Sequence, residues 1–355
     1  MGRLVGVSSA AVSAVINGAQ SQVRIAEATR QRILEAAAKL HYRPNAAAQA
    51  LARRKMNSVG VTATLSHGFN LYAMEILSGI INAATRQGQN TSVFTVVDWI
   101  DGVRQLRTFC DGRVDGMILL GPDIPTTLIE TLPDHVPFVA LHPNSQLPGV
   151  CAVEIDEEDG ACQAVRRLIA LGHRRIMHVS GRRGGIAAER RIAGWMRAHD
   201  EAGISWEPDL LVAGAFTIGE GRRALSNWLD QARGEFPTAV FGGNDAIAIG
   251  CMSLLLDRGV RIPQDVSMLG FDDTICAQTT SPQLATVRQP LYDMAVRAVD
   301  LLLDQIATGE TIATRMLQPA VPPVVFPVEL VERASIGPAR NWSIDVAQGS
   351  ESGGG

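Results

Sequence analysis

The 355-residue sequence has no apolar run of 18 residues, and its first 30 positions hold no charged start followed by an apolar block. These absences argue against membrane spans and against secretory export. Cysteine is scarce and odd in number, and no Cys-x-x-Cys pair occurs among Cys110, Cys151, Cys162, Cys251 and Cys276. We therefore expect reduced, mostly buried thiols in a cytoplasmic protein.

Motifs of catalysis and metal binding are also missing. The sequence has no His-Glu-x-x-His, no Gly-x-Ser-x-Gly and no clustered Cys/His set, which leaves hydrolases and metal sites without support. The glycine-rich stretch 180–185 lacks the Gly-Lys-Ser/Thr ending of a phosphate loop and indicates a lid or turn. The pairs Glu157-Glu158 and Asp272-Asp273 alternate faces or lie in a turn, unlike a catalytic dyad. We expect no enzymatic activity, no metal and no cofactor.

Apolar side chains are plentiful enough to fill sizeable cores, since 46% of the residues are hydrophobic and 19% are charged. This composition excludes disorder, and the length predicts at least two domains. Residues 1–57 carry nine basic and two acidic side chains, a net charge of +7, whereas the rest carries −11. A small basic end on an acidic body indicates an arm that meets a polyanion, with a solvated basic tail as the alternative.

The basic end has the pattern of a helix-turn-helix. Ser8 can cap a short helix of small and apolar residues that stops at Asn17-Gly18, and Gly6 provides a tight turn before it. Another helix is expected from about 26 to 40. Residues 42–57 then form an alanine-rich, basic segment whose helix has no core of its own, which makes sense if it folds on docking to DNA.

From Ser58 onward, short apolar runs alternate with helical stretches, which predicts parallel sheets with right-handed crossovers, enough for two sheets. We expect the chain to cross between them near 155–157, 284–289 and 317–321. The expected strands are 58–64, 91–97, 115–120, 137–141, 175–180, 238–241 and 266–270, and the expected helices are 71–87, 102–112, 157–171, 187–203, 219–231 and 245–258. Polar residues follow several strands, and open α/β sheets bind ligands at that edge. They are Ser66, His67, His142, Asn244, Asp245, Asp272 and Asp273.

Several motifs together resemble the lactose-repressor (LacI/GalR) family of bacterial transcription regulators. They are G-V-S-x-x-x-V-S-x-V-I-N-G in the basic end, R-P-N-A-A-A-Q-A-L-A after it, and G-G-N-D-x-x-A-x-G, I-P-x-D-V-S-x-x-G-F-D-D and L-x-T-V-R-Q-P within 242–290. The resemblance spans about residues 3–335. It implies an α/β fold of two doubly wound parallel-sheet subdomains, similar to periplasmic binding proteins, preceded by an all-α headpiece and a hinge helix.

The resemblance also implies a domain plan. The headpiece would span 1–41 and the hinge helix 42–57. The core would span 58–335, with an N-subdomain of about 58–155 and 289–317, a C-subdomain of about 156–285 and 320–335, and a tail of 336–355. Family members carry a longer first helix than the four residues Arg3–Gly6 seen here, so an under-packed headpiece is expected.

DNA contacts are implied by position. The second helix would read the major groove, and paired hinge helices would enter the minor groove, where a leucine wedges between bases. The base-reading residues would be Ser9, Ala10, Ser13 and Ala14; Ser8 and Asn17 would lie near phosphates, and Leu51 would be the wedge, flanked by Asn45 and Ala48. Because these side chains are short, few bidentate base contacts are expected. An ordinary contact of Leu51 with the core is the alternative.

A small-molecule effector would bind between the subdomains. The resemblance implies polar anchors, a stacking ring and edge residues: Arg191, Asn244 and Asp272; Phe216; Gln289 and His142; and Phe69 or Tyr72 from the first core helix. The bland alternatives are that Arg191 pairs with Glu189 or Glu201, that Asn244 only caps a helix, and that Asp272 only holds a turn. A histidine beside Arg191 would suit an anionic ligand such as a sugar acid.

The implied function is a homodimeric, ligand-controlled regulator, usually a repressor, that binds a palindromic double-stranded operator and responds to a sugar, sugar acid, nucleoside or purine. The tail lacks the leucine heptads of a four-chain bundle, which favours a dimer. The alternative is a cytosolic small-molecule binding module whose shortened headpiece no longer reads DNA. A periplasmic receptor lacks support because no signal sequence is present.

Overall fold

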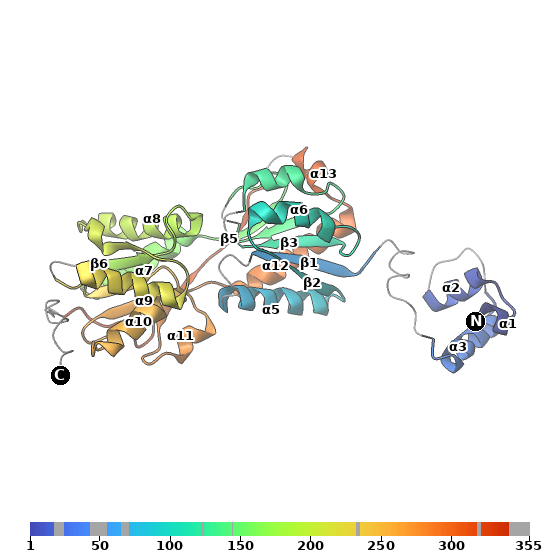
Figure 1. The fold of residues 1–355 in the computed structure, drawn as a ribbon, viewed down its shortest axis with the longest axis horizontal. Helices are drawn as coiled ribbons and strands as arrows, with labels where there is room; N and C mark the ends of the chain where they lie inside the picture. The colour runs from blue at the N-terminus through green and yellow to red at the C-terminus, as the bar shows by residue number, and fades with distance from the viewer. Residues whose placement is uncertain are drawn as a thin grey trace, which may run out of the picture.

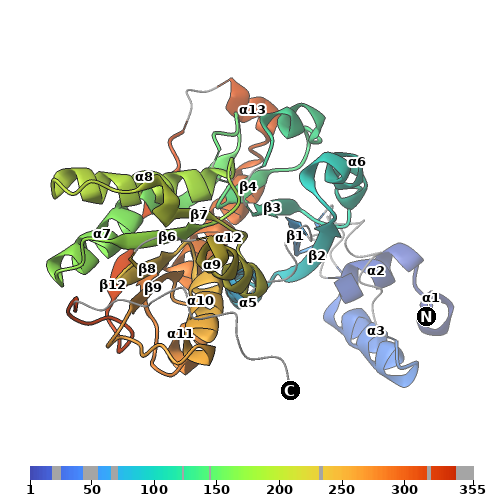
Figure 2. The same cartoon turned by 60° about the vertical axis from the view of Figure 1, so that its left-hand side comes forward.

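The computed structural model describes residues 1–17, 25–42, 55–64, 71–121, 124–143, 145–231, 235–317 and 321–340. Figure 1 shows a small all-α headpiece and two α/β subdomains, which lie side by side in the views of Figures 1 and 2. Within the described residues, no helix has both the length and the apolar character needed to cross a membrane.

The described part of the headpiece contains three helices: α1 (Gly2–Val5), α2 (Ser9–Asn17) and α3 (Glu27–Lys39). Gly6 ends α1 with a φ of 69°, a left-handed conformation that suits glycine. The hydroxyl of Ser8 accepts a hydrogen bond from the amide of Ala11 at 3.2 Å, so the expected cap of α2 is confirmed. The helices share a core of four buried side chains: Val5, Val15, Ile33 and Ala36.

The N-subdomain holds a six-stranded sheet in the order β11-β5-β4-β3-β1-β2, with every neighbouring pair parallel. Its strands are β1 (Ser58–Thr64), β2 (Asn90–Val96), β3 (Gly116–Leu120), β4 (Phe138–Leu141), β5 (Cys151–Ile155) and β11 (Val324–Phe326). Its helices are α5 (Leu71–Arg86), α6 (Trp99–Phe109), the 3-10 helix Thr126–Thr131, α12 (Leu291–Thr308) and α13 (Ile312–Met316).

The C-subdomain repeats this design with the strand order β12-β10-β9-β8-β6-β7, in which only the β10–β12 pair is antiparallel. Its strands are β6 (Ile176–Ser180), β7 (Leu211–Ala213), β8 (Ala239–Gly242), β9 (Ser267–Asp272), β10 (Ala285–Arg288) and β12 (Glu329–Val331). Its helices are α7 (Glu157–Ala170), α8 (Ile186–Glu201), the 3-10 helix Pro208–Leu210, α9 (Ile218–Gln231), α10 (Asp245–Asp257) and α11 (Ile275–Thr279).

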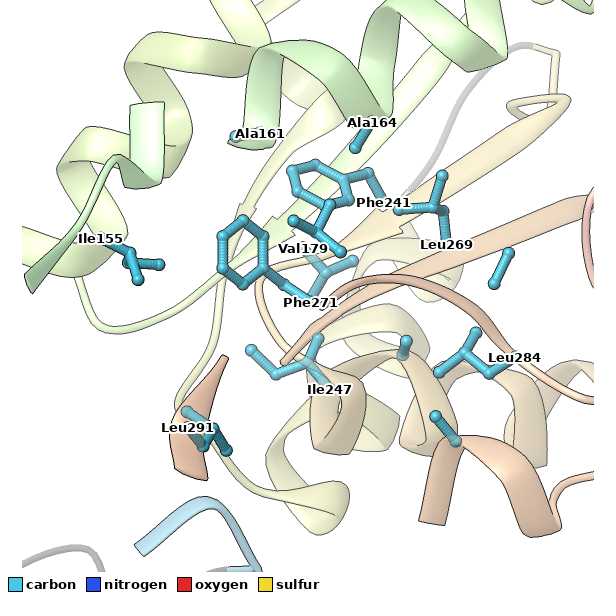
Figure 3. Close-up of a cluster of buried hydrophobic side chains, with 14 of the residues drawn as sticks. Ile155, Ala161, Ala164, Val179, Phe241, Ile247, Leu269, Phe271, Leu284 and Leu291 are labelled. Atoms are coloured by element: carbon cyan, nitrogen blue, oxygen red, sulfur yellow. The ribbon is translucent and has the colours of Figure 1, made fainter. Parts of the chain in front are cut away.

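Helices cover both faces of the second sheet, because its central strands are apolar on both sides. Figure 3 shows Ala161 of α7 on one side of the strand side chains and Ile247 of α10 on the other. Phe241 and Phe271, from β8 and β9, fill the space between them and are fully buried. This core holds the carboxyl ends of β8 and β9 rigidly beside the crossing segments.

The chain crosses between the subdomains three times. It passes from β5 to α7 at 156 and from β10 to α12 at 289–290. The third expected crossing, near 317–321, is wrong. Because β11 pairs with β5 in the first sheet, the chain crosses only at 327–328, and residues 324–326 belong to the N-subdomain rather than to the C-subdomain.

Candidate functional site

A cleft lies where the carboxyl ends of the strands of both subdomains face each other. Its lining in the described residues comes from α5 of the N-subdomain and from α9, α10, α11 and the end of β9 in the C-subdomain: Leu71, Tyr72, Ile218, Asn244, Ala246, Ile249, Asp272, Thr274 and Cys276. Four of the five cysteines are buried and none forms a disulfide, whereas Cys276 is half-buried at this cleft. The position agrees with the strand-end edge expected from the sequence.

Arg191, on α8, is a buried cation beside Asp272 of the cleft lining. Its side chain is buried and donates a hydrogen bond of 2.5 Å to the carbonyl oxygen of Gly243. The guanidinium lies 3.9 Å from the ring centre of Phe271, which covers one of its surfaces. Glu189, one of the two alternative partners on the same helix, does not pair with Arg191, because it pairs with Arg183 instead.

Glu201, the other alternative partner of Arg191, pairs with Arg166 at 2.7 Å. The carboxylates that do face Arg191 come from other elements. Glu157, the first residue of α7, lies 3.5 Å from the guanidinium, and Asp272, at the end of β9, lies 3.8 Å from it. The guanidinium therefore faces two carboxyl groups from different elements, one at the start of α7 and one at the end of β9.

Glu157 is the residue of this site that the sequence did not reveal, since a pair of adjacent acids on a helix usually faces solvent. It is 1% exposed, and its Oε1 accepts a hydrogen bond from His142 Nε2 at 2.5 Å. Burial alone raises the pKa of this carboxyl, but Arg191 and the His142 hydrogen bond outweigh it and hold the pKa at about 2. Glu157 is therefore ionised at neutral pH.

His142 connects the two subdomains. It directly follows β4 with a φ of 57°, and its Nδ1 forms a short hydrogen bond with the hydroxyl of Tyr72 on α5. Because a carboxylate only accepts, the proton on Nε2 is the one donated to Glu157. In the neutral imidazole, Nδ1 then accepts from Tyr72. A continuous chain Tyr72–His142–Glu157 thus runs from the N-subdomain to the C-subdomain.

Asp272 and Asp273 diverge from the end of β9. Asp272 accepts a hydrogen bond from Gln289 Nε2 at 2.7 Å, at the second crossing, and its burial raises the pKa of its carboxyl well above the usual value. Asp273 turns the other way and pairs with Arg288 and Arg333 at 2.7 and 2.6 Å. Only Asp272 belongs to the cleft, and Asp273 holds the strand ends behind it.

Asn244 caps α10, since its Oδ1 accepts from the amide of Ile247 at 2.9 Å. The cap uses the amide oxygen, so the amide NH₂ is the group that Asn244 can offer to a ligand in the cleft it lines. Phe216 is half-buried, and its ring centre lies 5.5 Å from the guanidinium of Arg191. Of the expected effector residues, the structure thus brings Tyr72, His142, Arg191, Phe216, Asn244, Asp272 and Gln289 together.

The remaining expected residues fall into two groups. Phe69, with Ser66 and His67, and the hinge residues Asn45, Ala48 and Leu51 lie outside the described residues. The expected base-reading residues lie on α2, with Ser9, Ala10 and Ser13 exposed and Ala14 half-buried, and Ser8 is exposed just before the helix. Asn17 is the last residue of α2. These placements leave the small-residue face of α2 open to a partner.

Metal-binding clusters of three or more His, Cys, Asp or Glu side chains do not occur among the described residues.

Two protein families match the chain. Residues 2–45 match the bacterial regulatory proteins of the lacI family, and residues 165–336 match the periplasmic binding protein-like domain.

Curated proteins and solved structures agree with these matches. Catabolite control protein A of Priestia megaterium is 33% identical over 322 residues, which cover 89% of this chain and 94% of that protein. The HTH-type transcriptional repressor PurR of Vibrio atlanticus (strain LGP32) is 32% identical over 86% of this chain and 90% of its own length. The Lac repressor dimer bound to operator and an anti-inducer superposes with a TM-score of 0.80 at 26% identity, covering 95% of this chain and 97% of that one.

A transcriptional regulator CelR in complex with cellobiose superposes with a TM-score of 0.67 at 28% identity, covering 94% of this chain and 98% of that one. These relatives are transcription regulators rather than enzymes. The headpiece, the paired subdomains and the cleft residues all occur in one chain here, over nearly the full length of the relatives. The chain belongs to the lacI family of bacterial regulatory proteins, and it is a DNA-binding, ligand-responsive transcription regulator.

Proposed function

We propose that this protein is a cytoplasmic, non-enzymatic repressor that binds a palindromic operator as a homodimer and is controlled by a small sugar-like or nucleoside-like effector in the cleft. The observation that carries the proposal is the coexistence in one chain of a basic headpiece, with α2 exposing its small residues, and a cleft between two subdomains that is lined by Tyr72, Asn244 and Asp272 among apolar side chains. The Lac repressor dimer on its operator and CelR with cellobiose supply the precedent for both halves.

Control follows from linkage between the cleft and the headpieces. An effector that binds one arrangement of the two subdomains more tightly shifts the population toward it, by as much as its two affinities differ. The headpiece precedes β1 of the N-subdomain, so in a homodimer a change in the relative orientation of the subdomains would alter the spacing of the two headpieces. Whether the effector releases or tightens the repressor depends on which arrangement holds the headpieces at the operator's spacing.

The DNA contacts that we propose lie on α2 and the hinge. Ser9, Ala10, Ser13 and Ala14 would meet base edges, Ser8 and Asn17 would meet phosphates, and Leu51 with Asn45 and Ala48 would enter the minor groove. Because the α2 side chains are short, we expect methyl contacts and DNA deformability to supply much of the sequence preference.

The test is a selection from random duplex DNA with the full chain, followed by a salt titration on the enriched site. We expect a palindrome of roughly two helical turns and a steep fall of affinity with salt, since residues 1–57 carry a net charge of +7 in each protomer of the dimer and neutralise several phosphates. A folded dimer that enriches no site, or whose affinity hardly depends on salt, would contradict the repressor and favour a binding module that reads no DNA.

A further inference from the structure

We propose that Glu157 sets the charge selectivity of the cleft, so that the effector presents an uncharged hydrogen-bonding group, such as a hydroxyl, to Arg191 rather than a carboxylate or phosphate. The inference rests on the proposed function only in taking this cleft as the effector site. It replaces the sugar acid that the sequence suggested, and it assigns a role to a residue outside the expected set.

Three buried polar atoms beside this cleft have no hydrogen-bond partner among the residues that the structure describes: Glu157 Oε2, Arg191 Nε and Gln289 Oε1. Arg191 Nε and Glu157 Oε2 form an ion pair at 3.5 Å without hydrogen-bond geometry. Buried polar atoms without partners are costly, by about 1–3 kcal/mol each, so a ligand group that satisfies them binds with a gain. The set consists of two acceptors and one donor.

A hydroxyl fits this set because it both donates and accepts. It can accept from Arg191 Nε and donate to Glu157 Oε2 or to Gln289 Oε1. A carboxylate or phosphate only accepts, so it would satisfy Arg191 and place its charge against the acceptor oxygens of the other two residues. The polar pattern therefore discriminates by hydrogen-bond direction as well as by charge.

The charges in the cleft lead to the same result. Arg191 has the ionised carboxylate of Glu157 at 3.5 Å, so an anionic ligand would find a cation that is already compensated. His142 cannot replace it, because its Nε2–H is donated to Glu157. Glu157 stays ionised, since the pKa of its carboxyl is held at about 2. Like charges in a site of low dielectric repel strongly.

The test compares Glu157→Gln with wild-type protein as full chains, with inorganic sulfate as the probe in isothermal titration calorimetry. Glutamine keeps the shape and can still accept from His142, while the charge that compensates Arg191 is lost. We expect sulfate to bind the variant about tenfold more tightly or better than wild type. Adding Arg191→Met to Glu157→Gln should abolish the gain.

Glu158→Gln is the matched control, because Glu158 is the next residue of α7, is 42% exposed and pairs with Arg197 at 2.6 Å. It changes the net charge by the same amount without touching the cleft, so sulfate binding at the basic headpiece is common to both variants. A folded Glu157→Gln protein that binds sulfate no better than Glu158→Gln would overturn the inference.

A second measurement uses wild-type protein alone. Thermal unfolding is followed with matched neutral and acidic sugars, D-glucose against D-glucuronate and D-galactose against D-galacturonate. A sugar acid that stabilises the wild-type protein more than the matching neutral sugar does would also overturn the inference. If neither the neutral sugars nor the acids bind, the comparison of sulfate binding tests the inference by itself. Neither assay involves DNA, so both results can be interpreted even if the operator selection that tests the proposed function fails.

Discussion

Three residues at strand ends combine a left-handed or otherwise rare backbone with a function in or behind the cleft. His142 has a φ of 57°, Asp272 of 120° and Asp273 of 59°. Positive φ is uncommon outside glycine and is tolerated best by Asn, Asp and His, whose polar groups can bond locally. At this site it aims His142 at Glu157 and sends the two adjacent aspartates to opposite sides. Strained backbone of this kind persists where the surrounding structure holds it.

His178 provides a prediction for the pH dependence of stability. It is fully buried on β6, stacked on Phe241 with ring centres 4.7 Å apart, and burial lowers its pKa to about 4, with Arg191 adding to the shift and a hydrogen bond to Phe241 O opposing it. The unfolded chain takes up this proton near pH 6.5, whereas the folded chain takes it up only near 4. Stability is therefore lost as pH falls through this window, by about 3 kcal/mol in all.

The measurement is chemical denaturation at pH 6.5 and pH 4 for wild type and for His178→Asn. Asparagine can donate to the same carbonyl but has no proton to gain. We expect the free energy of unfolding to fall more in wild type, by about 3 kcal/mol. Buried carboxyls such as Asp245, whose pKa burial raises to about 6, affect both proteins alike. Equal pH dependence in the two proteins would show that His178 does not contribute.

At the scale of elements, α9 and α10 pack backbone against backbone through two glycines. A Cβ on Gly250 of α10 would lie 2.1 Å from the carbonyl oxygen of Ile218, and one on Gly221 of α9 would lie 2.3 Å from that of Ile247. Helices this close bring Ile218 and Asn244, at the starts of α9 and α10, into one cleft wall. A side chain at either glycine would force the wall apart.

Gly250→Ala is therefore expected to destabilise the protein by about 2 kcal/mol, because overpacking against a backbone carbonyl outweighs the better helix propensity of alanine. Gly219→Ala on α9 is the matched control, since a Cβ there meets nothing within 4 Å. It should be neutral or stabilising by up to about 1 kcal/mol. Denaturant titration measures both, and equal stability of the two variants would argue against close packing at Gly250.

At the scale of the whole molecule, contacts across the cleft set the balance between subdomain arrangements. Besides the His142–Glu157 pair, Glu75 of α5 accepts a hydrogen bond of 3.0 Å from the amide of Ile275, the first residue of α11. The negative side chain at a helix start adds a favourable charge interaction. This contact joins the N-subdomain to the C-subdomain and exists only while they lie close together.

Glu75→Ala should shift the ligand-free protein toward a more open arrangement, by about 1 kcal/mol or roughly fivefold in population. We expect a larger radius of gyration by small-angle scattering and faster hydrogen exchange in α11. Asn82→Ala, on an exposed face of the same helix, is the control and should change neither. If scattering and exchange match wild type, the contact does not hold the cleft.

Much of the fold was predictable from local pattern. The strand expected at 58–64 is β1, and the helices expected at 157–171 and 245–258 differ from α7 and α10 by a single residue at one end. These elements have long apolar runs or clear periodicity, which depend on neighbouring residues alone. Five short strands were not predicted: β5, β7, β10, β11 and β12. All five are only three to five residues long, and β7, β11 and β12 are partly exposed, so their identity depends on which strand they pair with.

The sequence by itself determined the family and the alternation of strands and helices, and it pointed to Tyr72, Asn244 and Asp272 of the cleft lining, because motifs and periodicity are properties of neighbouring residues. The tertiary structure alone decided the third crossing, since β11 becomes part of the first sheet only by pairing with β5. It also decided the role of Glu157. Nothing local separates Glu157 from Glu158, yet folding buries Glu157 beside Arg191 and His142, from distant parts of the chain, and leaves Glu158 partly exposed and paired with Arg197. Burial and charge compensation are set by partners that only packing brings together.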